Sequence, residues 1–211
     1  MKILVFGASG ATGRELVRQG LAAGHQVSAF VRNPANLSAT PNLHVIQGDV
    51  FDPEQVAAAI QGQDAVFTAL GARTLGPNDL LPKSSANIIA GMKRHGVRRL
   101  IVLGAAGAYR DAGKYATPFR RLFLRLIKRT LLKYPFINSS IQQQQVEASG
   151  LDYTVVLPPR LTNGPAVGRY RVEFDGLPPK GMTLSRADLA EFMLKQLSDP
   201  TWVRKAPYVA Y

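Results

Sequence analysis

The glycine-rich run Gly7-Ala8-Ser9-Gly10-Ala11-Thr12-Gly13 is the feature that most constrains the fold of this chain. It follows the apolar residues 3–6, which predict a short strand buried on both faces of a parallel sheet. After the run, apolar residues recur at helical spacing up to Gly24, where a helix is expected to end. A strand, a glycine-rich loop and a helix in this order indicate the first half of a βαβ unit.

The GxxGxxG spacing suits a loop that holds a pyrophosphate. Gly7 permits a sharp turn out of the strand, Gly10 lets backbone N–H groups approach a phosphate, and Gly13 lets the helix lie close to the sheet. The phosphates would lie at the positive end of the helix dipole. We therefore predict a dinucleotide site, to which this loop contributes Gly7, Ser9, Gly10, Ala11, Thr12 and Gly13.

The end of the second expected strand, residues 26–31, favours NADP(H) over NAD(H). An NAD site would place Asp or Glu there to hold the ribose 2′-hydroxyl, but the chain has no acidic residue between Glu15 and Asp49. Arg32 stands at that position instead, and a guanidinium can bind a 2′-phosphate through two charge-assisted hydrogen bonds. The alternative for Arg32 is an ordinary solvated surface charge.

Apolar strands alternate with helical patterns along the rest of the chain, which predicts an α/β fold. We expect a Rossmann-like, doubly wound, mostly parallel sheet of six or seven strands, formed as a single domain by residues 1–211. The later strands are expected at 43–46, 64–71, 100–103 and 153–157, with short strands at 170–174 and 208–209, and a stiff loop at 158–162. Helices are expected at 53–60, from Ser84 or Ser85 to Gly96, at 119–134 with Pro135 ending it, from Ser139 or Ser140 to 149, and from 185 to about 197.

Ligands of such sheets bind beyond the carboxyl ends of the strands. The residues that follow the expected strands are therefore further candidates for cofactor contact. They are Asp49, Val50, Ala69, Leu70, Gly71, Arg73, Gly104, Ala105, Pro158 and Pro159.

Composition narrows the classes of function. The chain has no cysteine, which excludes disulfides and thiolate catalysis, and no metal-ligand spacing is present. No apolar run is long enough to span a membrane and no leader precedes the first strand, so we expect a cytoplasmic protein.

The net charge of +12 is concentrated in one segment, because residues 112–146 contain no Asp or Glu. Within it, residues 119–134 predict a helix with one apolar and one basic face. It could be a plain surface helix, a wall of an acceptor pocket that attracts an anionic substrate, or a contact with an anionic membrane surface. Nucleic acid is not expected, because no recognised binding motif accompanies the basic residues.

Together these stretches resemble the atypical short-chain dehydrogenase/reductase group of the NAD(P)-binding NmrA-like type. Within that group the chain is most similar to the biliverdin-IXβ and flavin reductases, which use NADPH. The matching stretches are 5–13, 31–32, 48–50, 63–66, 70–71, 87–97, 149–151, 158–159, 175–176 and 185–189.

Two positions depart from those reductases. Ala105 stands where they carry a serine, and Arg160 stands where a histidine follows the paired prolines. In addition, no lysine follows a tyrosine at the Tyr-x-x-x-Lys spacing that the main branch of short-chain dehydrogenases uses for proton transfer.

The resemblance implies an NADPH-dependent reductase of a planar conjugated acceptor such as a flavin, quinone or tetrapyrrole. Such an acceptor tolerates the missing groups, since its anion is delocalised and water can protonate it. Arg160 would orient an anionic acceptor unless it is an ordinary surface arginine, and Tyr109 would stack on the acceptor. The alternative is a non-catalytic NADP(H)-sensing protein, as some NmrA-like proteins are thought to be. Either would be a monomer or a small homo-oligomer.

Overall fold

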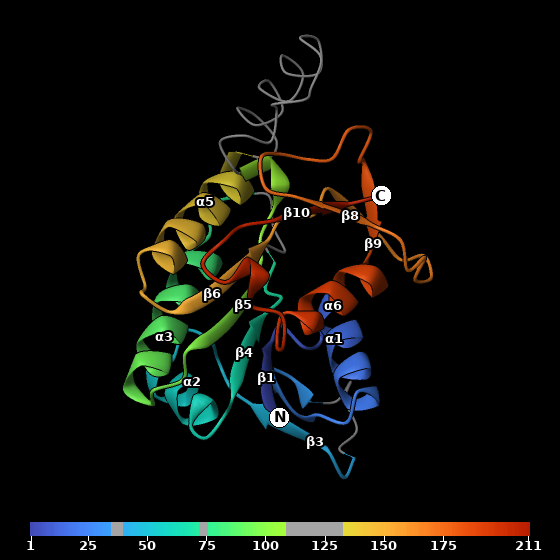
Figure 1. Cartoon of the computed structure of the whole chain (residues 1–211). Coiled ribbons are helices and arrows are strands. Elements are labelled where there is room, and N and C mark those ends of the chain that lie inside the picture. Colours follow the sequence, from blue (N-terminus) through green and yellow to red (C-terminus); the bar gives the residue numbers. More distant parts are fainter. Residues whose placement is uncertain (35–39, 72–75, 109–132) are drawn as a thin grey trace.

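The computed structural model contains a central sheet of six parallel strands with helices on both faces (Figure 1). It describes residues 1–34, 40–71, 76–108 and 133–211. The strand order is β3-β2-β1-β4-β5-β6, so the order reverses between β1 and β4. The strands are β1 (Lys2–Phe6), β2 (Gln26–Val31), β3 (Leu43–Gln47), β4 (Ala65–Thr68), β5 (Arg99–Leu103) and β6 (Asp152–Val156). This order confirms the doubly wound Rossmann-like sheet.

The helices cover the two faces of the sheet unequally (Figure 1). One face carries α1 (Ala11–Ala22) and α6 (Arg186–Lys195), which pack on each other. The other carries α2 (Pro53–Ile60), α3 (Leu80–Arg94) and α5 (Lys133–Glu147), of which α3 packs on both neighbours. Because both faces are covered, β1 is apolar from Ile3 to Phe6 and fully buried, which explains its uninterrupted hydrophobic run.

Two small sheets lie beside the carboxyl ends of the central strands (Figure 1). In one, β7 (Arg160–Thr162) pairs in parallel with β9 (Thr183–Ser185); in the other, β8 (Arg171–Glu173) pairs antiparallel with β10 (Tyr208–Ala210). Short 3-10 turns occur at Ala106–Ala108 and Pro200–Trp202. Among the described residues, no helix has the length and apolar character needed to cross a membrane.

The expectation that Ser84 or Ser85 caps the third helix is wrong, because α3 already begins at Leu80. The Ser84 hydroxyl instead donates to the Leu80 carbonyl one turn earlier, and both serines are buried inside the helix. Pro82 falls in the first turn, where its missing N–H group breaks no hydrogen bond.

Two expectations around residues 133–162 are also wrong. The described helix α5 begins at Lys133 rather than at Ser139 or Ser140, and Pro135 lies in its first described turn instead of ending a helix. Residues 160–162 form a strand rather than a loop, because β9 supplies a hydrogen-bonding partner from more than 20 residues further along the chain. Most of the expected basic helix, residues 119–132, lies outside the described residues.

Gly7 and Gly13 let the loop between β1 and α1 pack closely. Gly7 has a φ of +80°, which supports the sharp turn expected there, and a Cβ atom on it would lie 2.7 Å from the Ala69 carbonyl oxygen. A Cβ atom on Gly13 would lie 2.1 Å from the Gly7 carbonyl oxygen. The start of α1 therefore fits against the strand only when residue 13 has no side chain.

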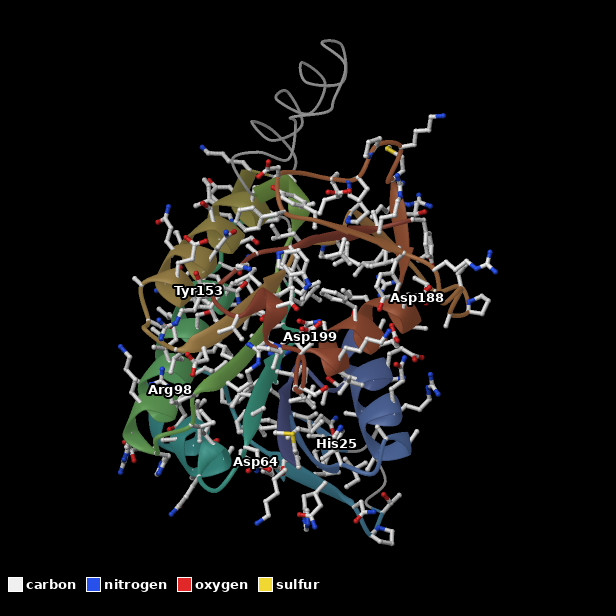
Figure 2. All side chains as sticks on the ribbon, viewed as in Figure 1. His25, Asp64, Arg98, Tyr153, Asp188 and Asp199 are labelled. Carbon is white, nitrogen blue, oxygen red and sulfur yellow. The ribbon has the colours of Figure 1, made fainter. Side chains whose placement is uncertain are left out.

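Asp188 fixes the start of α6 (Figure 2). Its carboxylate is only 1% exposed and accepts hydrogen bonds from the backbone N–H groups of Val167 and Gly168, each at 2.9 Å. The hydroxyls of Ser185 and Tyr211 donate to it as well. Burial raises the pKa of this carboxyl, but the donors from Tyr211, Val167, Gly168 and Ser185 outweigh burial and lower the pKa overall.

Replacing Gly13 by alanine should destabilise the fold by about 3 kcal/mol or more, because the new Cβ atom meets backbone that cannot move aside. Gly76→Ala is the matched control, since nothing lies within 4 Å of a Cβ atom at Gly76 and its φ is not positive. Chemical denaturation of both variants measures the difference. Equal stabilities would contradict the packing role assigned to Gly13.

Asp188→Asn should lower the free energy of unfolding at pH 7 by roughly 1.5–3 kcal/mol, since an amide loses the charge-assisted bonds and presents NH₂ to backbone donors. The folded pKa lies below the unfolded value of about 3.9, so the stabilisation is present above that value. It is lost as the pH falls through the folded pKa. Wild type and variant should therefore converge at low pH in denaturation curves, whereas exposed Glu173→Gln should track wild type throughout.

Candidate functional site

A cavity of about 360 Å³ opens at the carboxyl ends of the central strands, where the strand order reverses. Open α/β sheets bind their ligands at this point. Its wall combines backbone of the glycine loop with apolar side chains and two arginines. The lining residues are Gly7, Ser9, Gly10, Ala11, Thr12, Phe30, Val31, Arg32, Gly48, Asp49, Val50, Phe51, Ala69, Leu70, Gly71, Leu80, Leu103, Leu161 and Arg186.

The glycine loop presents the first turn of α1 to this cavity. Gly10 occupies the N-cap position and has no side chain to accept from the first-turn N–H groups, and that turn contains no acidic residue. The Gly10 N–H donates to the Gly7 carbonyl at 3.0 Å, which closes the loop. The turn is therefore arranged to bind an anion through backbone donors.

Arg32 lies at the end of β2, where it is exposed and lines the cavity. A second arginine, Arg14, lies beside the loop and donates from Nε to the Ser9 carbonyl at 3.1 Å. Among the cavity-lining residues of the described chain, Asp49 is the one carboxylate. Its Oδ1 accepts from the Phe51 N–H at 3.0 Å, so it stabilises a turn after β3. The end of β2 thus carries a cation and no acid.

Most of the predicted cofactor residues come together in this one cavity. Those that line it are Gly7, Ser9, Gly10, Ala11, Thr12, Arg32, Asp49, Val50, Ala69, Leu70 and Gly71. Gly13 lies behind the loop, in the contact between α1 and β1. Arg73 and Tyr109 lie outside the described residues.

The predicted residues after β5 and β6 do not line the cavity. A Cβ atom on Gly104 would lie 2.8 Å from Leu157 Cδ2, so this glycine allows close packing at the ends of the two strands. Pro158 is buried and accepts from the Ala106 N–H at 3.1 Å, while Ala105 and Pro159 are half-buried. Arg160 is exposed on β7 and is not among the lining residues.

Several lining residues escaped the sequence analysis. Phe30, Gly48 and Phe51 flank positions that were predicted, and the 45% exposed ring of Phe51 forms part of the wall. Leu161 and Arg186 reach the cavity through the pairing of β7 with β9. That pairing joins two strands of three residues each, and strands so short leave almost no hydrophobic alternation in the sequence from which they could be predicted.

A tyrosine and a lysine do meet in the structure, but away from the cavity. Lys195 Nζ lies 3.3 Å from the Tyr170 hydroxyl, which itself donates to Glu191. Burial, followed by the hydrogen bond to Glu191, raises the pKa of Tyr170 to about 12. A proton-donating tyrosine needs a lowered pKa, so this pair does not provide one.

Of the three histidines, His25 has a pKa lowered by burial and by the N-terminal charge. Figure 2 shows it with Asp64 at the amino-terminal end of the central strands, opposite the cavity. It is therefore not placed to exchange protons with a ligand there.

The family model described as NAD(P)H-binding matches residues 7–200. An uncharacterised chloroplast protein of Arabidopsis thaliana is 28% identical over 208 residues, which cover 93% of this chain and 71% of that protein. Several other curated relatives match over a smaller share of their own length, between 18% and 49%.

Solved structures share the fold over the whole chain. A short-chain dehydrogenase/reductase from Veillonella parvula, solved in complex with NADP, superposes with a TM-score of 0.80 at 20% identity, covering 100% of this chain and 94% of the other. The anaerobilin reductase ChuY from Escherichia coli O157:H7 gives 0.80 at 20% identity, covering 100% and 97%. The family match spans the glycine loop, the cavity and both helical layers, and by it this chain belongs to the NAD(P)H-binding family.

Proposed function

We propose that this protein is an NADPH-dependent reductase that passes hydride to a planar conjugated acceptor. The observation that carries the proposal is the cavity at the strand-order reversal, which combines an uncapped first helical turn with Arg32 and apolar walls. Membership of the NAD(P)H-binding family supports the cofactor class.

The residues present fit a dinucleotide. A Cβ atom on Gly7 would fall 2.7 Å from the Ala69 carbonyl oxygen, so the loop is shaped to bring backbone, rather than side chains, to the cavity. The volume of about 360 Å³ falls in the range of ligand pockets. The N–H groups at the start of α1 would hold the phosphates, and Val50 and Phe51 would contact the adenine.

Arg32 would select the phosphorylated cofactor. It is the lining cation at the end of β2, and in the described residues no hydrogen bond from its guanidinium to another side chain competes for it. The 2′-phosphate would take two of its donors, whereas a 2′-hydroxyl offers it no charge.

When bound, the nicotinamide would supply the hydride for a two-electron reduction of the acceptor, and water would supply the proton. Leu103 and Leu161 line the cavity with apolar surface and would pack against a planar ring. Ala105 carries no hydroxyl, so this chain would position the acceptor rather than protonate it. An acceptor whose anion is delocalised suits such a site.

Arg32→Ala should weaken NADPH binding about ten- to a hundredfold and leave NADH binding nearly unchanged, because one charge-assisted contact is worth roughly 1.5–3 kcal/mol. Arg18→Ala is the control, since Arg18 pairs with Glu15 on α1 and does not line the cavity. Fluorescence titration of both cofactors gives the two dissociation constants. Equal losses for NADPH and NADH would show that Arg32 does not read the 2′-phosphate.

NADPH oxidation should accelerate when FMN, menadione or a bilin is added to the purified protein. The bilin is included because ChuY, which shares the fold, is an anaerobilin reductase. The rate with NADPH should exceed the rate with NADH, and Arg32→Ala should remove most of that preference. Tight NADPH binding without turnover of any acceptor would reject the reductase and favour an NADP(H)-sensing protein.

A further inference from the structure

We propose that Arg186 binds the diphosphate of the dinucleotide, as a second contact besides the glycine loop. This inference rests on the proposed cofactor binding and adds a residue from the far end of the chain to the site. It concerns the part that NADPH and NADH have in common, and is therefore independent of what Arg32 recognises.

The small parallel sheet carries Arg186 to the cavity. In the register of β7 and β9, Leu161 lies beside Leu184 and Thr162 beside Ser185. The next residues are Asn163 and Arg186, and Arg186 Nη1 donates to Asn163 Oδ1 at 2.6 Å. The guanidinium is thus fixed by a neutral amide before any ligand arrives.

Arg186 is the first residue of α6, which packs on α1, the helix that follows the glycine loop (Figure 1). Gln19 Nε2 of α1 donates to the Ala187 carbonyl at 2.9 Å, which joins the two helices next to Arg186. Arg186 then lines the same cavity as Gly10, Ala11 and Thr12. An anion at the first turn of α1 would face backbone N–H groups from one wall and a guanidinium from another.

The charge of Arg186 is not neutralised within residues 1–34, 40–71, 76–108 and 133–211, where its hydrogen bond goes to the Asn163 amide and no carboxylate pairs with it. The nearby carboxylate Asp188 is occupied by two backbone N–H groups and two hydroxyls. A half-buried cation without an anionic partner is the environment in which a charge-assisted bond to phosphate contributes most.

The two arginines that line the cavity belong to different halves of the sheet, so we expect them to contact different phosphates. Arg32 ends β2 and so belongs to the half of the sheet formed by β1, β2 and β3. Arg186 follows β9, whose partner β7 comes directly after β6 in the other half. A dinucleotide spans both halves with its diphosphate at the reversal between them. The geometry therefore assigns the ribose phosphate to Arg32 and the diphosphate to Arg186.

The test is titration of wild type, Arg186→Gln and Arg186→Lys with NADPH, NADH and adenosine 2′-monophosphate, which has no diphosphate. Arg186→Gln should weaken NADPH and NADH by the same factor, about tenfold or more, and leave adenosine 2′-monophosphate unchanged. Arg186→Lys should recover part of the loss, since it keeps the charge but not the planar donors. Arg18→Gln is the control for removing one surface arginine.

Asn163→Ala tests the positioning contact separately. It removes the acceptor that fixes the guanidinium but keeps the charge, so it should weaken both dinucleotides by less than Arg186→Gln does. Combining the two substitutions should add little to Arg186→Gln alone, because both act on one contact.

Three results would overturn the assignment. Unchanged NADPH and NADH binding in Arg186→Gln would mean that Arg186 does not touch the cofactor, and a loss confined to NADPH would mean that it reads the 2′-phosphate. Weaker adenosine 2′-monophosphate binding together with a lower melting temperature would indicate a distorted site instead. If the wild-type protein bound neither NADPH nor NADH, the proposed function itself would be wrong. The titration of wild type distinguishes that result from a failure of the Arg186 assignment.

Discussion

The contact between α1 and β1 is the constraint on which the rest of this structure depends. The Gly7 carbonyl lies so close to residue 13 that a Cβ atom there would stand 2.1 Å from it. This approach holds the start of α1 against the end of β1, where Gly10, Ala11 and Thr12 line the cavity. A side chain at Gly13 would push the start of α1 away from the loop, and a side chain at Gly7 would push the loop away from the backbone of Ala69 and Leu70. The absence of side chains at Gly7 and Gly13 is therefore needed both for the stability of the fold and for the shape of the cavity.

The wall contributed by the C-terminal half depends on a different kind of interaction. The Asp188 carboxylate accepts hydrogen bonds from the backbone N–H groups of Val167 and Gly168. It also accepts from the hydroxyls of Ser185, in β9, and of Tyr211. These bonds hold the beginning of α6 in place while α6 packs on α1. Because Arg186 is the first residue of α6, the buried carboxylate of Asp188 helps to determine where this cavity-lining cation lies. A network of this type is worth most when every member is satisfied.

The features that could be predicted from the sequence are those determined by residues close together in the chain. The turn at Gly7 and the starts of α2 and α6 depend on residues close together in the chain, and the structure places them where they were expected. The early start of α3 was missed because Ser84 and Ser85 resemble capping residues. In the structure both serines are buried within the helix, whose first turn contains Pro82 and the buried Leu81. Leu161 and Arg186 could not be predicted as site residues, since their position follows from pairing two distant three-residue strands. Arg160, which the sequence analysis proposed as a residue that orients the acceptor, is exposed and does not line the cavity.

The chemistry of the cavity wall then limits what kind of selectivity the site can have. Its polar groups are the backbone of the glycine loop, the hydroxyls of Ser9 and Thr12, two arginines and one carboxylate already engaged in a turn, while the remaining side chains are mostly apolar. Such a wall distinguishes ligands by the position of negative charge and by shape. The pKa of Tyr170, whose hydroxyl accepts a hydrogen bond from Lys195, is raised to about 12, and this tyrosine does not line the cavity. The proposed transfer of hydride to an acceptor that takes its proton from water would make the least chemical demand on such a wall.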